Sequence, residues 1–486
     1  MDEERADRSS VPEALKPRKV LVIAGPTAVG KTRLSLSVAR ALGGEVVSAD
    51  SVQVFEGLDV GSSKLPEAER EGIKHHLLDI ADPRRDVGAG EFVEKAWAAM
   101  DDVLRRGKTP VVVGGTGMYL RWLIEGKPDT PPSSPEASAL ARATLRRVAG
   151  EAAAVAERAA RDALRPDEGG SLDAASLERV RLAGELAGWR AAMRVLSEAG
   201  DATAATRLAR NDWYRAERAL EVVTSTGKPV TEFGAPTLAG REKKYDFVCV
   251  ALSSPRIRLY RRIDARVEEM VRDGMLAESA AMLLSGIEPG STPASRAIGY
   301  RQTMDFLVEQ SALSALSEKK NDDDGTATGT RLCEHAAFLA YVEETQRATR
   351  AFAKRQFTWF RGEKEGRYRW LDTSRMPDDA GSPDALARAT LDLFALGPPP
   401  ETASRGDAPR DGDGAVFGDW DAEALNRLAA LTDVSRGATD HETARELKRY
   451  APRQTVFVDP AASRRTRREV DALAEKIRKA ASERER

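Results

Sequence analysis

The sequence predicts an α/β fold: a parallel sheet flanked by helices, with an inserted helical domain and a C-terminal helical extension. Three observations carry this prediction. Short apolar runs alternate with amphipathic stretches near the N-terminus, and strand–helix–strand alternation is typical of parallel sheets. Residues 136–208 are rich in Ala, Arg, Glu and Leu and contain no strand pattern. After about residue 395 the chain becomes rich in Pro, Gly and charged residues before helical patterns return.

Three short apolar runs are expected to form buried strands, because each is bounded by glycine or by polar residues. They are KVLVIAG (19–25), GEVVSAD (44–50) and PVVVGG (110–115). Residues 34–42 and 90–107 have the apolar spacing of amphipathic helices. The sequence does not give the order of the strands.

A proline-rich break at 129–135 separates this region from the helical insert at 136–208. Residues 210–230 then predict a helix that ends near Gly227, with Pro229 beyond it. Both residue types are common just after helix C-termini, so this boundary is well specified.

The run at 245–252 is expected to be a strand that rejoins the sheet, and long helices are expected at 256–285 and 334–360. Residues 318–330 are polar and predict a solvated loop or insertion. Six parts are therefore expected. They are a flexible N-terminus (1–18), the first part of the core (19–135), the helical insert (136–208), the second part of the core with its long helices (209–395), a linker (396–417) and a C-terminal extension of unknown role (418–486).

The formal net charge of −2 differs from that of a globally basic nucleic-acid binder, so any RNA contact must come from local patches. The two cysteines, Cys249 and Cys333, lack CxxC spacing, which argues against a zinc site and favours a reducing compartment. No apolar run approaches the ~20 residues of a membrane helix, and the first residues resemble neither a signal nor a transit peptide. We therefore expect no membrane association and a cytoplasmic location, with plastid or mitochondrion as alternatives if a leader is missing or atypical.

GPTAVGKT (25–32) has the GxxxxGKT pattern of a phosphate-binding loop and lies between a predicted strand and a predicted helix, as this motif requires. Its glycines let backbone N–H groups approach phosphate oxygens, Lys31 adds a mobile charge, and the Thr32 hydroxyl is expected to bind Mg²⁺. The fold is thus expected to be like that of P-loop NTPases, although the third strand lacks the usual Mg²⁺-binding acid at its end. A chance glycine turn is the alternative. The expected phosphate-binding residues are Gly25, Pro26, Thr27, Ala28, Val29, Gly30, Lys31 and Thr32.

Asp50 ends the second predicted strand, at the sheet edge where ligands gather. If this strand neighbours the first, Asp50 faces the phosphate loop. A carboxylate beside a diphosphate could accept a proton from a nucleophile, bind Mg²⁺ or cap a helix. Spacing alone leaves all three roles open.

Seven ordered motifs resemble the tRNA dimethylallyltransferases, also called tRNA isopentenyltransferases, and the plant and algal branch in particular. The resemblance covers about residues 19–372. The motifs are GPTAVGKT (25–32), ADSVQVFEGLDVGSSK (49–64), HHLLDIADP (75–83), GGTGMYL (114–120), NDWYRAERALEV (211–222), IGYRQ (298–302) and AKRQFTWFR (353–361).

The resemblance implies transfer of a dimethylallyl group from dimethylallyl diphosphate to N6 of the adenosine 3′ of the anticodon. It makes Asp50 the general base, Thr27 the residue that positions Asp50 and contacts the substrate, and Arg218 a cation that neutralises the leaving diphosphate. Lys31, the loop amides and Mg²⁺ would stabilise the same growing charge. The anticodon stem-loop would be gripped by the insert at 136–208, and a monomer is expected.

The target adenosine would be flipped out of its loop to reach the phosphate loop. The resemblance assigns contacts with the target nucleotide to the segment after Asp50 and to the GGTG motif. A run of basic residues with interleaved aromatics at 347–369 is the local patch that RNA binding requires; a solvated helix with an aromatic core face is the alternative. The expected tRNA contacts are Asp50, Ser51, Val52, Gln53, Thr116, Arg215, Arg350, Lys354, Arg355 and Gln356.

Phe55 stands where many relatives have Tyr, and Ala209-Arg210 precedes Asn211-Asp212 where many have His-Pro. His75 and His76 are expected to make structural hydrogen bonds, and the tail after residue 400 to be a solvated helix. Three other functions are considered: a P-loop small-molecule kinase, an adenylate isopentenyltransferase that makes cytokinin, and a non-catalytic RNA-binding protein. The AKRQFTWFR segment favours tRNA over free nucleotide.

Overall fold

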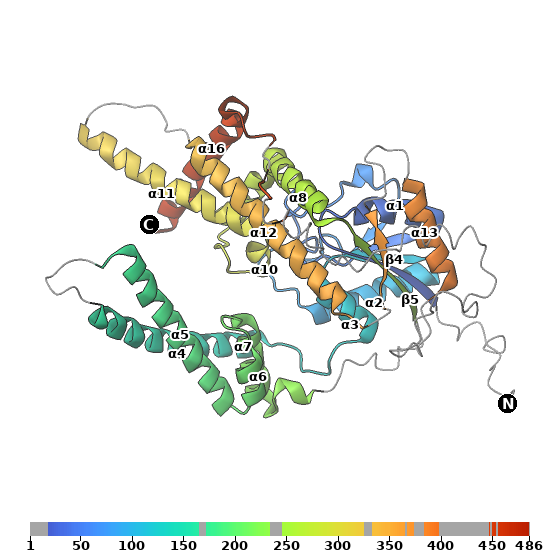
Figure 1. Ribbon diagram of the computed structural model, residues 1–486, viewed down its shortest axis with the longest axis horizontal. Coiled ribbons are helices and arrows are strands. Elements are labelled where there is room, and N and C mark those ends of the chain that lie inside the picture. The colour runs from blue at the N-terminus through green and yellow to red at the C-terminus, as the bar shows by residue number, and fades with distance from the viewer. Residues whose placement is uncertain are drawn as a thin grey trace. The chain divides into compact units, whose positions relative to one another are not determined.

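The computed structural model describes residues 18–164, 172–233, 245–324, 333–364, 367–373, 383–397, 447, 450–452 and 455–485. The chain divides into two compact units (Figure 1). One unit combines Met1–Ile124 with Arg241–Arg486, and the other is Glu125–Gly240.

The first unit is built on a six-stranded sheet in the order β3-β2-β4-β1-β5-β6, with every neighbouring pair parallel. The predicted strands are confirmed, and two short edge strands are added that the sequence did not indicate. Parallel strands place all their carboxyl ends at one edge, where ligands bind in open α/β sheets. The strands are β1 Arg18–Ala24, β2 Glu45–Ser48, β3 His75–His76, β4 Pro110–Gly114, β5 Tyr245–Ser253 and β6 Arg369–Asp372.

The strand order answers a question that the sequence left open, namely whether the strand before Asp50 neighbours the first strand. Strand β4 lies between β1 and β2, so the strand that precedes Asp50 is not the neighbour of the strand that precedes the phosphate loop. The loop after β4 therefore lies between the other two loops at the carboxyl edge, and it carries the GGTG motif.

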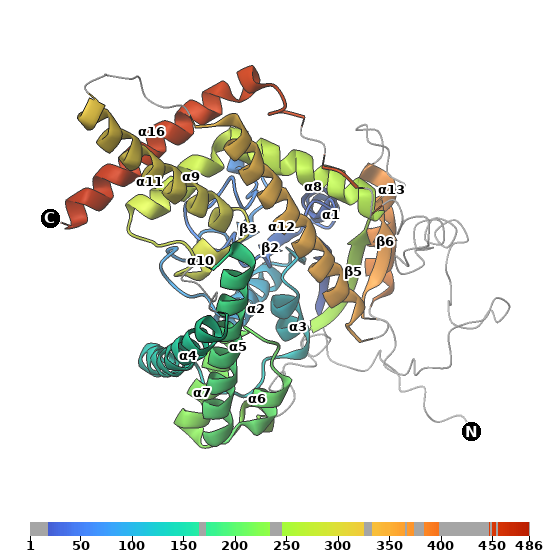
Figure 2. The ribbon, with the colours of Figure 1, turned by 60° about the vertical axis from the view of Figure 1, so that its left-hand side comes forward.

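Helices cover both faces of the sheet with their apolar sides. The central strands are therefore buried, and Val20 to Ala24 are fully buried. Helices α1, α8, α12 and α13 contribute to one core cluster with the strands. α8 and α12 run side by side in both ribbon views (Figures 1 and 2). The elements are α1 Lys31–Ala41, η3 Glu67–Glu69, α2 Ala89–Arg105, α3 Gly117–Glu125, α8 Arg256–Met270, α12 His335–Arg361 and α13 Pro383–Leu396.

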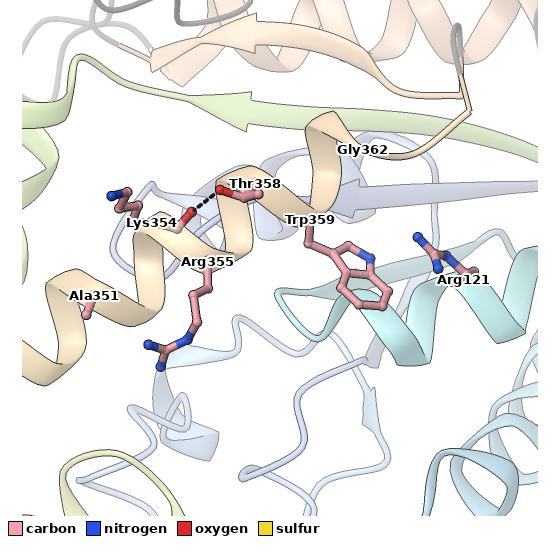
Figure 3. A pocket seen from close by; sticks show the side chains of 7 residues that line it. All are labelled: Arg121, Ala351, Lys354, Arg355, Thr358, Trp359 and Gly362. Atoms are coloured by element: carbon pink, nitrogen blue, oxygen red, sulfur yellow. Dashed lines mark hydrogen bonds between the residues drawn. The ribbon is translucent and has the colours of Figure 1, made fainter. Parts of the chain in front are cut away.

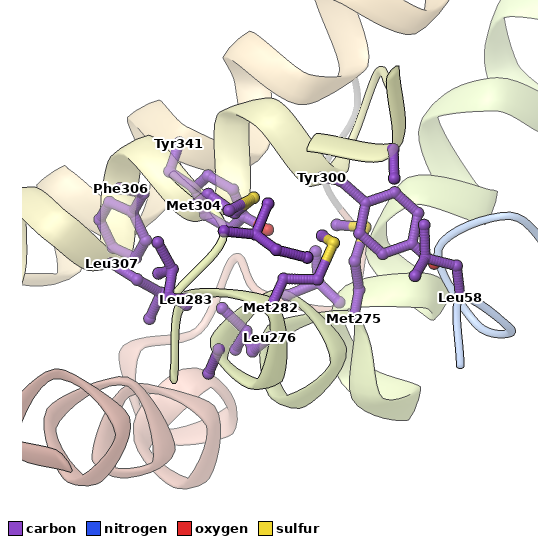
Figure 4. Close-up of a cluster of buried hydrophobic side chains, with 14 of the residues drawn as sticks. Leu58, Met275, Leu276, Met282, Leu283, Tyr300, Met304, Phe306, Leu307 and Tyr341 are labelled. Atoms are coloured by element: carbon purple, nitrogen blue, oxygen red, sulfur yellow. The ribbon is translucent and has the colours of Figure 1, made fainter. Parts of the chain in front are cut away.

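A second core of the first unit joins the segment around Leu58 to helices that lie after residue 270 (Figure 4). The single helix expected at 256–285 is wrong: a π turn, η5 Val271–Met275, separates α8 from α9 Leu276–Leu284. Gly274 has φ +130° in that turn, a conformation that other residues rarely adopt. α10 spans Pro293–Arg296.

The solvated loop expected at 318–330 is also corrected in part. Helix α11 runs from Tyr300 to Asp324, so the first residues of that stretch are helical. Lys and Glu are good helix formers, and charge alone did not signal a break. The rest of the stretch, from residue 325 onward, lies outside the described residues.

The C-terminal helix α16, Pro460–Glu485, is not simply solvated as expected. Its Val470 is fully buried, and Phe457 just before it meets Phe338 edge to face with ring centroids 5.0 Å apart. Asp471 accepts a hydrogen bond from the backbone N–H of Cys333 at 2.9 Å. The end of the chain is therefore part of the core. The predicted linker at 396–417 falls almost wholly outside the described residues.

The second unit is helical, with α4 Pro135–Ala163, α5 Ala174–Glu198, α6 Ala202–Arg207, α7 Trp213–Thr226 and η4 Val230–Glu232. α4 and α5 pack along their length, and Trp189 meets Trp213 edge to face at 5.1 Å. α7 ends at Gly227, which has φ +71°, as the sequence predicted. Because α7 packs on α4, this unit extends beyond the expected insert at 136–208.

None of the described helices combines the length and the hydropathy that crossing a bilayer would require. The expected structural role of the two histidines is confirmed: His75 Nδ1 lies 2.9 Å from the Ile73 carbonyl, and His76 Nε2 lies 2.7 Å from Glu45 Oε2. Phe55 is buried in an apolar cluster.

Candidate active site

The phosphate loop connects β1 to α1 through backbone conformations that favour glycine. Gly25 has φ +144°, and a Cβ there would lie 2.9 Å from the Leu252 carbonyl on β5. Gly30 has φ +106° and is the N-cap of α1; within the described ranges no side chain caps the helix. The first-turn amides of α1 are thus open to an anion, with the positive end of the helix dipole behind them.

Lys31 lies over this loop. Its Nζ donates hydrogen bonds to the carbonyls of Gly25 and Pro26, at 3.0 and 2.8 Å. Burial lowers the pKa of Lys31 to about 8; nearby Asp50 acts in the opposite direction, and Arg266 adds to the lowering. The lysine is therefore a desolvated cation close to a carboxylate.

Asp50 follows β2 and uses one carboxylate oxygen to shape its own turn. Its Oδ1 accepts from the backbone N–H groups of Val52 and Gln53, at 2.9 and 3.3 Å. Its Oδ2 makes no hydrogen bond within the part of the chain that the structure describes. The two oxygens thus differ: one holds the turn, and the other is available to a substrate proton or a metal ion.

The GGTG loop contacts this turn directly. The Thr116 hydroxyl accepts a hydrogen bond from Ser51 N at 3.1 Å and donates one to Ser51 Oγ at 3.3 Å. The expected nucleotide contacts Ser51 and Thr116 are therefore adjacent to each other and to Asp50, although they come from loops 65 residues apart.

Gln53 is tied into the protein by its own amide. Its Oε1 accepts from Ser48 Oγ at 2.9 Å, and its Nε2 donates to the Ser62 and Ser63 carbonyls at 3.3 and 3.4 Å. A contact between Gln53 and an adenine edge would have to replace or share these bonds. That contact stays a prediction.

The loop at 59–63 is anchored by Glu278 on α9, a residue that the sequence did not single out. Its carboxylate accepts hydrogen bonds from the backbone N–H groups of Asp59, Val60 and Gly61 at 2.7–3.0 Å. It also accepts one from the Tyr300 hydroxyl at 2.7 Å. The anchor connects two motifs of the resemblance, DVGSS and IGYRQ.

Arg266 on α8 is a second functional candidate beyond those expected from the sequence motifs. Its Nε donates to Ser63 Oγ at 2.8 Å, and burial lowers the pKa of Arg266 while Asp50 opposes that shift. The guanidinium is thus a partly buried cation close to both Asp50 and Lys31. α8 carries five arginines interrupted by three acidic residues, so the sequence alone does not show which arginine faces the site.

The glycines of the GGTG motif allow three close contacts. A Cβ on Gly114 would lie 2.0 Å from the Ala49 carbonyl, one on Gly115 would lie 2.3 Å from Gln356 Nε2, and one on Gly117 would lie 2.2 Å from the Trp359 ring. The motif therefore lets α12 and the turn before Asp50 approach the same short loop.

Gln356 corrects an expectation. It was predicted to contact the tRNA backbone, but its side chain is buried, with 7% of the residue exposed. Its Oε1 accepts from Thr27 N at 2.9 Å and its Nε2 donates to the Gly115 carbonyl at 3.0 Å. Both ends of the amide are occupied inside the protein. The Thr27 N–H is likewise committed, and no described residue hydrogen-bonds the Thr27 hydroxyl.

Arg350 is also less open than expected. It forms an ion pair with Asp264 on α8, and its side chain is only 13% exposed. Asp264 also accepts a hydrogen bond from the Tyr450 hydroxyl at 2.6 Å. The charge of Arg350 is therefore largely compensated within the fold.

Lys354 and Arg355, by contrast, are exposed on α12 and line a groove between α12 and α3 (Figure 3). The Arg121 guanidinium lies 4.3 Å from the centroid of the Trp359 ring. Cations around an aromatic wall suit a nucleic-acid strand. The groove is lined by Arg121, Ala351, Lys354, Arg355, Thr358, Trp359 and Gly362.

Arg218 and Arg215 belong to the second unit. Arg218 pairs with Glu221 at 2.9 Å and donates to the Pro131 carbonyl, so it fixes the entry to α4. Arg215 is exposed and pairs with Asp212, the N-cap of α7. Their expected roles toward diphosphate and tRNA stay predictions.

An anion-binding loop, a half-free carboxylate and two desolvated cations at the carboxyl edge of a parallel sheet define a P-loop-like α/β enzyme that acts on a phosphorylated substrate. The family model for IPP transferase matches residues 53–168 and 168–363. The chain belongs to this family, the tRNA dimethylallyltransferases.

The relatives agree with this assignment. The chain is 38% identical over 389 residues to tRNA dimethylallyltransferase 9 of Arabidopsis thaliana, covering 74% of this chain and 72% of that one. It is 33% identical to tRNA dimethylallyltransferase of Protochlamydia amoebophila, covering 73% and 84%. A solved eukaryotic dimethylallyltransferase that acts on tRNA has the same fold, with a TM-score of 0.50, 24% identity and coverage of 79% and 81%.

Proposed function

We propose that the chain transfers the dimethylallyl group of dimethylallyl diphosphate to N6 of the adenosine at position 37 of tRNA, 3′ to the anticodon. The products are N6-isopentenyladenosine and diphosphate. The observation that carries the proposal is the Asp50 carboxylate, which has one unpartnered oxygen among the described residues and lies close to the lysine of the phosphate loop.

The donor's diphosphate would bind the first-turn amides of α1 and Lys31. Lys31 donates to two loop carbonyls, and phosphate oxygens are stronger acceptors for this ammonium. Arg266 faces the same region, and Arg218 is proposed as a further cation. These groups would stabilise the charge that grows on the leaving diphosphate.

In the transfer step, the bond between N6 and the allylic carbon forms as the carbon–oxygen bond to diphosphate breaks. The electron pair of the broken bond leaves with the diphosphate, and the N6 proton goes to Asp50 Oδ2. Thr116 and Ser51 lie beside Asp50 and are proposed to hold the flipped nucleotide. No ATP is needed, because the donor is already activated.

The residues present fit a magnesium ion. Mg²⁺ prefers oxygen ligands and usually keeps several waters while it binds substrate phosphates. Thr32 is exposed at the start of α1, directly after the anion-binding loop, and would supply a hydroxyl. When bound, Mg²⁺ would neutralise part of the negative charge of the diphosphate.

Lys354 and Arg355 are proposed to contact the tRNA backbone in the groove beside α3. The insert at 136–208 is proposed to grip the anticodon arm, and the protein is proposed to act as a monomer. Cys249 and Cys333 are buried and form no disulfide, which suits a reducing compartment such as the cytoplasm.

Labelled dimethylallyl diphosphate incubated with the protein and either tRNA or AMP tests the proposal. Label is expected on tRNA and absent from AMP. Label on AMP alone would support an adenylate isopentenyltransferase, and turnover of ATP without prenyl transfer would support a kinase. Either result would refute the proposed function.

A further inference from the structure

We propose that Gln356 is a positioning residue that sets the spacing between the diphosphate loop and the loop that holds the target nucleotide. The inference deepens the proposed function and rests on it for the roles of the two loops. The contacts of Gln356 themselves do not depend on which reaction occurs.

A single planar amide bridges the two loops. Gln356 Oε1 accepts from Thr27 N at 2.9 Å, and Gln356 Nε2 donates to the Gly115 carbonyl at 3.0 Å. The loops follow β1 and β4, which are neighbouring strands. The distance between the loops is therefore determined by the length of one rigid group that a third element, α12, inserts between them.

The bridge continues toward the proposed base. Gly115 precedes Thr116, whose hydroxyl accepts a hydrogen bond from Ser51 N, and Ser51 follows Asp50. A continuous path of hydrogen bonds and short stretches of backbone thus connects the phosphate loop to the Asp50 carboxylate. Prenyl transfer needs donor carbon and acceptor nitrogen aligned, so a shift of either loop would reduce the rate more than the binding of either substrate.

The surroundings of the Gln356 side chain are buried and closely packed, so few other side chains could replace it. A Cβ on Gly115 would lie 2.3 Å from Gln356 Nε2. Leu would fill a similar volume but leave the Thr27 N–H and the Gly115 carbonyl without a partner. Glu would keep the acceptor but lose the donor and place a negative charge against the diphosphate loop. Asn would be one methylene too short to bridge.

The same helix offers a matched control. Gln346 is also buried on α12 and also donates its Nε2 to a backbone carbonyl, that of Asp264, at 3.1 Å. It contacts α8 rather than the phosphate loop. Gln346→Leu therefore removes the same chemical group from the same helix without touching either loop.

The experiment compares steady-state kinetics of Gln356→Leu, Gln356→Glu and Gln346→Leu in the full-length protein, with Tm measured for each. Gln356→Leu is expected to lower kcat about 100-fold while the KM for tRNA stays within about threefold. Gln356→Glu is expected to recover little of that loss. Gln346→Leu is expected to keep kcat within about threefold and to lower Tm less than Gln356→Leu, because it leaves one backbone group without its partner rather than two. Equal kcat for the two leucine variants would overturn the proposal.

A second measurement separates this inference from the proposed function. Amide hydrogen exchange of the peptide that contains Thr27 should be about five- to tenfold faster in Gln356→Leu than in Gln346→Leu, because one hydrogen bond is lost. This readout needs no substrate. If the unaltered protein transfers no label to tRNA, the proposed function fails while the bridge is still tested; unchanged exchange in Gln356→Leu would refute the bridge itself.

Discussion

Replacing Asp50 by Asn separates the two tasks that the structure assigns to its carboxylate. The Asn side-chain oxygen can still accept from Val52 N and Gln53 N, which Asp50 Oδ1 holds at 2.9 and 3.3 Å. The turn should therefore persist. The second position becomes an NH₂ group that cannot accept a proton. Only the base is lost.

The expected losses of transfer rate and of stability can be estimated from these contacts. Loss of a positioned general base costs about 10²–10⁴-fold in rate, which corresponds to about 2.7–5.4 kcal/mol of transition-state stabilisation. Asp50→Ala removes the turn bonds as well, at roughly 1 kcal/mol each, so it should also destabilise the fold by about 2 kcal/mol. Diphosphate affinity should stay within about threefold or improve in both variants, because a negative neighbour of Lys31 is removed.

Single-turnover transfer of labelled donor to tRNA measures the rate, calorimetry with inorganic diphosphate measures binding, and urea unfolding measures stability. Asp305→Asn is the matched control, since that carboxylate is half exposed and, among the described residues, pairs only with Arg301 in its own helix. Transfer by Asp50→Asn within about tenfold of the unaltered protein would refute the base assignment, because that is below the range for a positioned base.

Five other outcomes are expected. Because burial lowers the pKa of Lys31 from 10.5 to about 8, kcat/KM for the donor should fall as pH rises above about 8, where the ammonium that binds diphosphate deprotonates; a flat profile to pH 9.5 would count against this role. The folded state binds fewer protons than the unfolded chain between those two pKa values, so this group should make the fold more stable as pH rises through that window, visible as an upward contribution in urea titrations. Tyr300→Phe removes the hydroxyl that donates to Glu278 and should lower the free energy of unfolding by about 1–3 kcal/mol; an unchanged urea midpoint would contradict the anchor. Val470→Asp places a charge at a fully buried position of α16 and should destabilise the first unit by more than about 3 kcal/mol, measured by thermal unfolding; full stability would mean that α16 does not pack as described. Replacing Lys354 and Arg355 together by Ala should raise the KM for tRNA and reduce the salt slope of binding by about 1.4, at about 0.7 per single-strand phosphate contact, with kcat unchanged; an unchanged slope would exclude both contacts.

The elements that the sequence predicted well are those with local signals. The three apolar runs before the insert became β1, β2 and β4, and the glycine at position 227 ended α7, since buried strands and helix caps are determined by neighbours in the chain. The edge strand β3 was missed because only His75 and His76 pair there. The break between α8 and α9 was missed because a single Gly274 within a helical pattern is compatible with an unbroken helix.

The site residues whose roles depend on long-range packing could not be predicted from the sequence. The phosphate loop and Asp50 carry strong local motifs, so their residues were predicted directly. Gln356 was misread because its neighbours Lys354 and Arg355 are exposed and basic, and the sequence does not show that position 356 faces the opposite side of α12. Glu278 has no motif of its own; its role depends on α9 approaching a loop more than 200 residues earlier in the chain.

The spread of the family motifs over the chain has a physical explanation in α12. The AKRQFTWFR segment places Gln356 against Gly115 and Thr27, and Trp359 against Gly117, while Lys354 and Arg355 remain exposed. α12 thus packs against the GGTG loop with one face and exposes Lys354 and Arg355 on another. Glycine at 115 and 117 and the wide side chains at 356 and 359 fit only together, so a change on either segment requires a change on the other. The loss of stability caused by Gly117→Ala, measured by thermal unfolding, should therefore be smaller in a Trp359→Ala background than in the unaltered protein, because the added methyl group would lie 2.2 Å from indole atoms that the second change removes.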